Sequence, residues 1–331
     1  MYNTEKFVHR LLDSVLAQDY PRIEMIVVDD GSTDGSKGVV EGYRGCFEER
    51  GYTLRYVYQP NSGQSVAIKN GLPFVEGEYL TWPDSDDFYA TTDAISKMVG
   101  TLESASEEFQ MARTQVLYVE EEGFKTIRME GLKAKEEEDS SLFEDCLFGR
   151  NGFYYCAGSY LVRTKVLKEL TDFDIYTEKN AGQNWQLLLP VLYRYRCKTI
   201  LEPLFTVVER TGSHTRGHFR GFDGSVTRYD VYYSTRVETL KRIKGLPAQS
   251  LTQYQRKLQA DKNAVLLHIA IKDNSRAIAL TRLPACRPDM SKRDYAVLYF
   301  WLHLPGGTCL VNGYTKLHHL MSLFKRHLLH N

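Results

Sequence analysis

Residues 26–36 read IVVDDGSTDGS, an apolar run that gives way at once to polar, turn-forming residues. The segment from Glu24 to Val28 is rich in β-branched side chains, which favours a buried strand. Asp29 and Asp30 follow directly, so their carboxylates are expected at the carboxyl end of this strand. In sheets that alternate with helices, ligands bind beyond the carboxyl ends of the strands. The stretch therefore predicts an α/β fold with an acidic ligand site.

Strands and helices alternate on both sides of this stretch. We expect helices at 4–18, 33–50, 62–74 and 92–102, and further strands at 54–58 and 79–82. This alternation predicts a mainly parallel sheet with helices on both faces. After residue 110 the pattern loosens into a hairpin that turns at Gly123, a charged loop at 134–141, a helix at 187–195 and a strand at 201–208. From about residue 229 onward only helical periodicity remains.

The composition is that of an ordinary water-soluble protein. The chain has 331 residues, of which 43% are hydrophobic and 25% charged, which is enough for about two domains. No apolar stretch reaches the roughly 20 residues that a membrane-spanning helix needs, and the polar start of the chain does not resemble a signal peptide. The 6 cysteines have no close spacing, which indicates reduced thiols. These features predict a cytoplasmic protein.

Charge is distributed unevenly along the chain. Residues 1–210 carry 23 Lys and Arg against 35 Asp and Glu, whereas residues 211–331 carry 19 against 7. Together with the change of pattern, this predicts a first domain over 1–220 and a helical, basic region over 221–331. A basic region favours an anionic partner.

The end of this basic region has an amphipathic pattern. Apolar residues between 317 and 328 fall on one side of a helix. This predicts either a helix packed on its own domain or peripheral association with the inner, anionic face of a membrane. Nucleic acid would exploit the same charge, but the chain has no helix-turn-helix or RNP motif, and the acidic half would repel phosphate. We therefore expect no nucleic-acid partner.

A second acidic cluster follows the strand expected at 79–82. Asp84, Ser85 and Asp86 place two carboxylates two residues apart at a strand end, where both could face Mg²⁺ or Mn²⁺. Such a cation neutralises charge on a departing diphosphate. The alternative is that these aspartates only cap the following helix or favour a turn.

Three strings in order provide context for this cluster: IVVDDGSTDGS at 26–36, NSGQSVAIKNGL at 61–72 and GEYLTWPDSDDFY at 77–89. Together they resemble the nucleotide half of the family 2 glycosyltransferases of bacterial polysaccharide synthesis, and the match covers nearly all of residues 2–90. The resemblance implies the GT-A fold, a Rossmann-like mixed α/β sheet, here with a C-terminal helical extension. It also implies inverting transfer of a sugar from a nucleotide sugar, usually a UDP-sugar, to an acceptor hydroxyl.

The resemblance further implies roles for individual residues. Asp30 would bind the base, expected to be uracil, and Asp86 would ligate the metal. Lys69 occupies the position of an arginine near the nucleotide, with a solvated helix residue as the alternative. The nucleotide-sugar-binding residues implied in this way are Tyr2, Asp30, Lys69, Asn70, Asp84, Ser85 and Asp86.

A later segment, ERTGSHTRG at 209–217, adds a further expected ligand. His214 matches a histidine that many GT-A enzymes place near the metal, and would act there together with Asp86. Arg210 and Arg216 beside it could hold diphosphate oxygens. The alternative is a polar surface loop.

The chain departs from the family at its start. Family members have a strand such as VSIIIPV before Tyr-Asn, and here Met1 stands where that strand should end. We therefore expect a sheet in which this first, central strand is missing. Either the reading frame is truncated or another segment fills the gap.

The second departure concerns the catalytic base. Inverting transfer needs a carboxylate that takes the proton of the acceptor hydroxyl, and the family supplies it as the Asp of a Glu-Asp pair. Gln183 and Asn184 occupy that pair here, and an amide cannot act as a base. The candidate substitutes are Glu178, Asp174 and Asp172 on the preceding loop. The alternative for Gln183 and Asn184 is that they only cap the following helix.

The sequence thus favours a metal-dependent, inverting glycosyltransferase. It would transfer sugar from a UDP-sugar to a glycan or polyprenyl-phosphate-linked acceptor during synthesis of a bacterial capsule, O-antigen or exopolysaccharide. The alternative is a catalytically impaired protein of the same fold that still binds nucleotide sugar, as Asn184 and the missing strand suggest. In that case transfer is weak and Asn184→Asp raises it. A dinucleotide-binding oxidoreductase fits the alternating pattern but is set aside, because no GxGxxG follows a strand.

Overall fold

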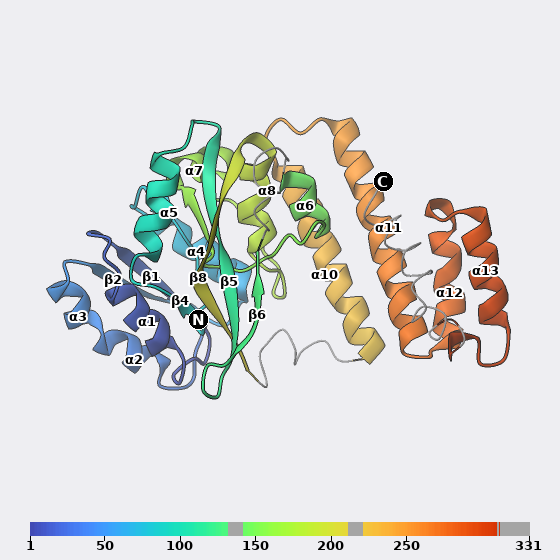
Figure 1. Cartoon of the computed structure of the whole chain (residues 1–331), viewed down its shortest axis with the longest axis horizontal. Coiled ribbons are helices and arrows are strands. Elements are labelled where there is room, and N and C mark those ends of the chain that lie inside the picture. Colours follow the sequence, from blue (N-terminus) through green and yellow to red (C-terminus); the bar gives the residue numbers. More distant parts are fainter. Residues whose placement is uncertain (132–141, 211–220, 310, 312–331) are drawn as a thin grey trace. The chain divides into compact units, whose positions relative to one another are not determined.

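The computed structural model describes residues 1–131, 142–210, 221–309 and 311. The chain divides into two compact units, Met1–Thr211 with Glu238–Gly245, and Gly212–Val237 with Leu246–Asn331. The first unit contains strands and helices, and the described part of the second is helical (Figure 1). The charged loop, His214, Arg216 and the terminal amphipathic helix expected from the sequence lie outside the described residues.

The strands of the first unit form two sheets. The smaller pairs β1 (Glu24–Asp29) with β2 (Thr53–Tyr58) in parallel. The larger has the order β3-β7-β5-β8-β4, and β6 pairs with β5 beside this path. Its members are β3 (Tyr79–Leu80), β4 (Phe88–Tyr89), β5 (Phe109–Glu120), β6 (Thr126–Glu130), β7 (Tyr160–Arg163) and β8 (Arg196–Glu209).

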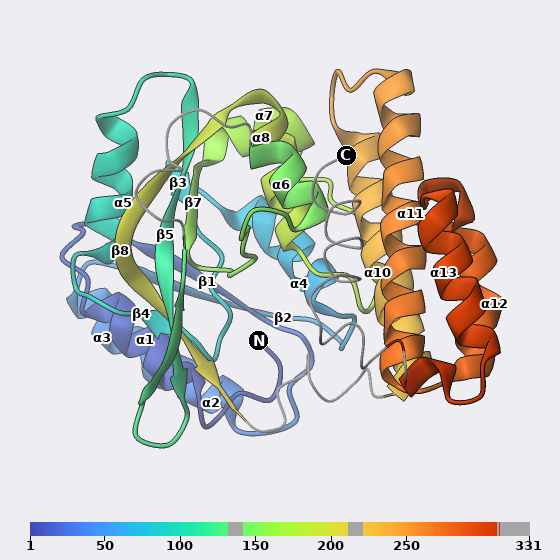
Figure 2. The ribbon, with the colours of Figure 1, turned by 45° about the vertical axis from the view of Figure 1, so that its right-hand side comes forward.

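The mixed α/β sheet implied by the resemblance is confirmed, but the mainly parallel arrangement inferred from the alternating pattern is wrong. β5 and β8 run parallel and side by side (Figure 2). In contrast, β3–β7, β4–β8, β5–β6 and β5–β7 are antiparallel pairs. A hairpin such as the β5–β6 turn at Gly123 must reverse the chain, whereas parallel neighbours need a long crossover.

The helices of the first unit bury the apolar faces seen in the sequence. In α1 (Val8–Leu16) the buried residues Val8, Leu11, Leu12 and Val15 have helical spacing. The helix expected at 33–50 is divided into α2 (Ser36–Gly42) and α3 (Arg44–Glu49), where two glycines next to the break lower the helix propensity. The remaining helices are α4 (Gln64–Gly71), α5 (Ala94–Glu103), α6 (Leu142–Phe148), α7 (Thr164–Thr171) and α8 (Asn184–Arg194).

The edge of β1 that faces away from β2 is paired at one point only among the described residues. The amino group of Met1 donates to the Val28 carbonyl at 2.6 Å, and the Asp30 amide donates to the Met1 carbonyl at 2.8 Å. Two such bonds, one on each side of Asp29, follow the pattern of a parallel ladder. No described strand continues this pairing along β1, and β1 and β2 form a sheet separate from the larger one.

The second unit confirms the predicted helical extension. It contains α11 (Ala248–Lys272), α12 (Arg276–Cys286) and α13 (Lys292–His303), with a 3-10 turn at Arg287–Asp289, while α10 (Gly221–Arg242) supplies residues to both units. Helix α12 packs against both α11 and α13. Their shared core consists of Leu267, Ala270, Ile271, Ala279, Leu283, Cys286, Leu298, Leu302 and Val311. Within the described ranges, no helix has the length and apolar character needed to cross a bilayer. The domain boundary at residue 220 stays a prediction.

A close backbone contact fixes the start of α4. Gly63 precedes this helix with a φ of +96°, and a Cβ atom there would lie 2.2 Å from the carbonyl oxygen of Lys179. Only glycine meets both conditions without strain. The contact therefore fixes the loop before α8 against the first turn of α4.

Gly63→Ala should lower the free energy of unfolding by about 2 kcal/mol or more. The new methyl group would clash with the Lys179 backbone, and alanine would be strained at a positive φ. Chemical denaturation measures this change. The control is Gly100→Ala in α5, where the methyl group would meet nothing within 4 Å. That substitution should stabilise the protein by about 0.5–1 kcal/mol. Equal effects of the two substitutions would contradict the proposed constraint.

Candidate functional site

The carboxylate of Asp30 joins the end of β1 to the start of α4. Its Oδ1 accepts hydrogen bonds from the Ser62 amide at 2.7 Å and from Gln59 Nε2 at 2.7 Å, and its Oδ2 accepts one from the Gly63 amide at 2.9 Å. Two of these donors are the backbone amides of the two residues that precede α4, and the nearby helix N-terminus stabilises negative charge. Asp30 is only 6% exposed, so this carboxylate is a structural connection as well as a candidate ligand group.

Asn70 is connected to Asp30 through Gln59. Its Nδ2 donates to Gln59 Oε1 at 2.8 Å, and Gln59 in turn donates to Asp30. Asn70 therefore orients the amide that holds the carboxylate. Tyr2 lies beside the same strand end, because Met1 pairs with Asp30, and its side chain is 40% exposed.

The first turn of α4 also reaches the second acidic cluster. Gln64 Nε2 donates to Asp84 Oδ1 at 2.8 Å. The next residue, Ser65, is buried, and its hydroxyl donates to the Glu178 carbonyl at 2.9 Å. The structure thus brings Asp30, Asp84 and the backbone of Glu178 to one helix end.

Burial and mutual repulsion raise the proton affinity of the acidic cluster. Burial raises the pKa of Asp84 to about 6, with Asp86 adding to the shift. Asp87 is 6% exposed, and burial raises the pKa of that carboxyl well above its usual range, again with help from Asp86. Its Oδ1 accepts a hydrogen bond from the Val208 amide at 3.0 Å. Asp87 therefore connects the cluster to β8, a role that the sequence did not indicate.

Asp86 is paired with an arginine. Arg210 directs both Nε, at 3.0 Å, and Nη2, at 2.6 Å, to Oδ2 of Asp86. The guanidinium carbon lies 4.2 Å from the ring centroid of Phe7, a cation–π contact that holds the arginine in place. The sequence suggested Arg210 as a diphosphate ligand, and the contact with Asp86 was not foreseen. Ser85 lies between the two aspartates and is partly buried.

A cation site cannot be completed from the described residues as they stand. Among residues 1–131, 142–210, 221–309 and 311, no group of three or more His, Cys, Asp and Glu is arranged to hold a metal. The second expected ligand, His214, lies outside these ranges. Oxygen donors from two carboxylates still match the preference of Mg²⁺ and Mn²⁺, so the donor chemistry fits once Arg210 leaves Asp86.

Both polar atoms of the Asn184 side-chain amide are hydrogen-bonded. Its Oδ1 accepts from the Trp82 indole at 2.9 Å, and its Nδ2 donates to the Tyr155 carbonyl at 3.1 Å. The indole can only donate, which fixes the orientation of the amide. A carboxylate at this position would face the Tyr155 carbonyl without a proton to donate. An amide is therefore the fitting group, and the neighbouring Gln183 is buried at the start of α8.

The three candidate carboxylates before α8 differ in their surroundings. Asp174 forms an ion pair with Lys69 Nζ at 2.6 Å, which lowers the pKa of the Asp174 carboxyl. Asp172 pairs with Lys244 Nζ at 2.8 Å. Glu178 Oε2 accepts a hydrogen bond from the Tyr176 hydroxyl at 2.9 Å, and its backbone is held by Ser65. Lys69 thus contacts Asp174 rather than either acidic cluster.

Known proteins with similar sequences fall into one group. A family model described as "Glycosyl transferase family 2" matches residues 1–171. "Glycosyltransferase GlyA" of Streptococcus pneumoniae is 40% identical over 88 residues, covering 27% of this chain and 12% of that protein. "Uncharacterized glycosyltransferase EpsJ" of Bacillus subtilis is 35% identical over 91 residues, covering 28% and 25%. The chain thus spans a quarter or less of the length of these two relatives.

Solved structures show the same fold at low identity. S. aureus TarS 1–349 in complex with UDP-GlcNAc aligns with a TM-score of 0.51 and 18% identity, covering 85% of this chain and 87% of that one. The mannosyltransferase PcManGT from Pyrobaculum calidifontis, in complex with GDP-Man and Mn²⁺, aligns with a TM-score of 0.53 and 16% identity, covering 99% and 82%. The chain therefore has the GT-A fold.

Asp84→Asn should stabilise the protein at pH 8 when neither metal nor nucleotide is present. The pKa of Asp84 in the folded protein is raised from 3.8 to about 6. The folded state therefore loses stability as the pH rises between these values, because Asp84 becomes charged in its buried position. Removing the charge should restore about 1–2 kcal/mol, after discounting for solvent contact. Thermal unfolding at pH 8 and pH 4 measures the difference, which should vanish at the lower pH.

The matched control for this prediction is Asp174→Asn. The ion pair with Lys69 lowers the pKa of Asp174, so loss of its charge should destabilise the protein slightly at pH 8. A melting temperature of Asp84→Asn at or below that of the unmodified chain at pH 8 would contradict the electrostatic account.

Proposed function

Because this chain belongs to glycosyl transferase family 2, we propose that it transfers a sugar from a nucleotide sugar, specifically a UDP-sugar, to an acceptor hydroxyl with inversion. The observation that carries the proposal is the meeting of Asp30 and Asp84 at the amino end of α4. A helix N-terminus favours an anionic group such as a diphosphate. The carboxylates beside it can accept hydrogen bonds from a nucleobase and a ribose. The complex of S. aureus TarS with UDP-GlcNAc supports a uridine nucleotide.

Asp30 is proposed to bind the base. A carboxylate has about four acceptor positions, and three hydrogen bonds to protein donors occupy Asp30. Oδ2 accepts only one of the three, so it retains room for the N3–H of uracil. Tyr2, which is exposed beside Asp30, would lie against the base, and Asp84 with Ser85 would contact the ribose.

Asp86 is proposed to hold Mg²⁺ or Mn²⁺, with His214 as a second ligand. The side chain of Asp86 is 24% exposed, so donor oxygens and water can reach it. Bound there, the cation would neutralise charge on the departing diphosphate. The solved complex of PcManGT with GDP-Man and Mn²⁺ supports a divalent cation in this fold.

Glu178 is proposed as the base, in preference to Asn184, Gln183 and Asp174. Both amides lack basicity, and Asn184 is committed to Trp82 and Tyr155. Asp174 is a weaker base because Lys69 lowers its pKa. Glu178 lies in the loop between α7 and α8, and Ser65 fixes its backbone next to the residue that holds Asp84.

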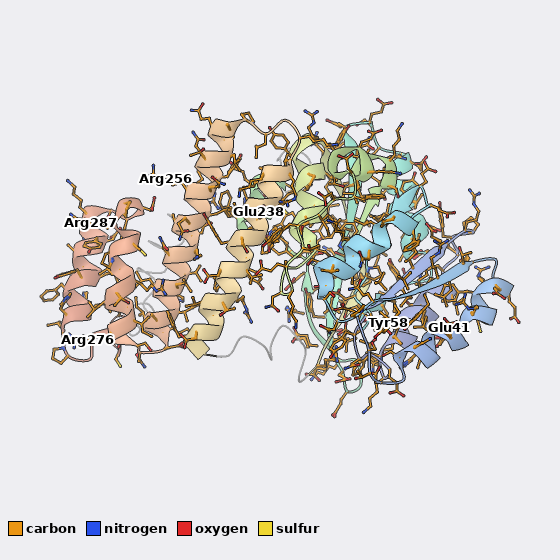
Figure 3. The ribbon with its side chains drawn as sticks, turned by 180° about the vertical axis from the view of Figure 1, so that it is seen from behind. Glu41, Tyr58, Glu238, Arg256, Arg276 and Arg287 are labelled. Carbon is orange, nitrogen blue, oxygen red and sulfur yellow. The ribbon has the colours of Figure 1, made fainter. Side chains whose placement is uncertain are left out.

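The acceptor is proposed to be a glycan or polyprenyl-phosphate-linked glycan, with peripheral association at the inner face of a membrane during surface polysaccharide synthesis. The support is the charge of residues 211–331, which carry 19 Lys and Arg against 7 Asp and Glu. Figure 3 labels three of these basic residues, Arg256, Arg276 and Arg287, on the helical unit. Anionic lipid and phosphate would be attracted to such a surface.

The second candidate function is a nucleotide-sugar-binding protein without turnover. Asn184 in place of the family's aspartate favours it. Release of UDP distinguishes the two functions. Either protein would bind UDP, but only the enzyme would release UDP from a UDP-sugar when an acceptor is present.

UDP should bind more tightly in Mn²⁺ than in EDTA, and Asp86→Ala should remove this difference, because the carboxylate would then be absent. Isothermal titration calorimetry measures both affinities. Glu49→Ala, at an exposed acidic residue of α3, is the charge-matched control and should behave as the unmodified chain. Equal UDP affinity of the unmodified chain in Mn²⁺ and EDTA would argue against a cation at Asp86.

Glu178→Gln should lower kcat by about 10²–10⁴, the typical contribution of a general base, with little change in UDP affinity. Release of UDP from a UDP-sugar with acceptor present measures the rate. Asp174→Asn is the matched control and should change kcat by a much smaller factor. A large loss in Asp174→Asn alone would move the base to Asp174, whereas a gain in Asn184→Asp would favour the impaired protein.

A further inference from the structure

The ion pair between Arg210 and Asp86 has an unusual geometry. Both donor atoms of the guanidinium, Nε and Nη2, converge on the same oxygen, Oδ2. The other oxygen, Oδ1, accepts no hydrogen bond from any residue that the structure describes. The two side chains are 19% and 24% exposed, so the pair is partly shielded from water. The ring of Phe7 also packs on the guanidinium.

This position of Arg210 has a direct electrostatic consequence. A guanidinium stays charged at every working pH, and it lies where a cation bound to Oδ2 would have to lie. Two cations at van der Waals distance repel strongly in a partly buried site. Arg210 and a divalent ion therefore exclude each other at Oδ2, and the same positive charge weakens cation binding at the neighbouring Oδ1.

A diphosphate changes the balance. It offers several anionic oxygens, and arginine pairs with phosphate through the same N–H groups that it now gives to Asp86. Strand β8 ends at Glu209, and Arg210 follows it directly. The side chain of Arg210 can therefore turn while the strand stays paired. A nucleoside diphosphate beside Asp84 would thus compete with Asp86 for Arg210.

We propose that Arg210 is the resident counter-ion of Asp86, and that a nucleoside diphosphate frees Asp86 for a divalent cation by drawing the guanidinium to its own oxygens. The proposal rests on the proposed nucleotide-sugar function. It makes cation binding and nucleotide binding mutually dependent, since each favours the arrangement in which Arg210 has left Asp86. The free protein would then hold divalent cations weakly, although its aspartates are suited to them.

The test is Mn²⁺ affinity, measured by the electron paramagnetic resonance signal of free Mn²⁺, with and without UDP. The unmodified chain should bind Mn²⁺ on the order of tenfold more tightly with UDP than without it. Arg210→Ala should bind Mn²⁺ about tenfold more tightly than the unmodified chain when UDP is absent, because Asp86 is then free. In that variant UDP should add much less.

Three further variants separate the causes. Arg210→Gln keeps hydrogen-bond donors without the charge, and should behave as Arg210→Ala. Arg163→Ala removes an equally shielded arginine, 25% exposed and paired with Glu103 at 2.9 Å, and should leave Mn²⁺ affinity unchanged. Asp86→Asn should weaken Mn²⁺ binding under both conditions. Thermal unfolding of each variant confirms that it is folded.

Mn²⁺ affinity without UDP that is equal or weaker in folded Arg210→Ala than in the unmodified chain overturns the counter-ion proposal. This comparison involves no nucleotide, so its failure is distinct from failure of the proposed function. Calorimetry with UDP, in Mn²⁺ and in EDTA, provides the second readout. Absence of UDP binding under both conditions overturns the proposed donor, and with it the coupling, whereas the comparison without UDP still decides whether Arg210 blocks Asp86.

Discussion

The hydrogen bonds from the Ser62 and Gly63 amides to the carboxylate of Asp30 are the contact on which the rest of the site depends. They fix the first turn of α4 against the end of β1. From that turn Gln64 reaches Asp84, and Ser65 holds the backbone of Glu178. A small shift of α4 would therefore move both acidic clusters and the loop before α8 together. The helix end also stabilises the charge of Asp30, so the contact holds without a ligand.

The electrostatics of the site favour ligand binding over stability. Asp84, Asp86 and Asp87 lie together in the loop between β3 and β4, and burial with mutual repulsion raises the pKa values of Asp84 and Asp87. Such a cluster is unfavourable in an empty site and becomes favourable when positive charge arrives. Arg210 supplies one such charge from within the chain. The proposed nucleotide diphosphate with its cation would bring a second positive charge to this cluster.

The sequence predicted the local parts of this arrangement because they depend on neighbouring residues. β1 and β2 end where the turn-forming residues begin, and the first acidic cluster lies at the end of β1 as expected. The strand expected at 79–82 is shorter, because β3 ends at Leu80, and the second acidic cluster lies in the loop before β4. The sequence did not predict contacts between distant segments. Arg210 and Asp86 are 124 residues apart, Lys69 and Asp174 are 105 apart, and Trp82 and Asn184 are 102 apart. Each of these contacts depends on how the strands and helices pack, and short β4 and β7 give too little pattern to be recognised.

The central claim is that a nucleoside diphosphate binds where Asp30 and Asp84 meet at the start of α4. A crystal structure of the full chain with UDP and Mn²⁺ tests it most directly. We predict uracil density at Oδ2 of Asp30, Mn²⁺ density at Asp86, and the guanidinium of Arg210 turned from Asp86 to the diphosphate. UDP bound away from α4, or at α4 with the Arg210–Asp86 pair intact and Mn²⁺ elsewhere, would contradict the account.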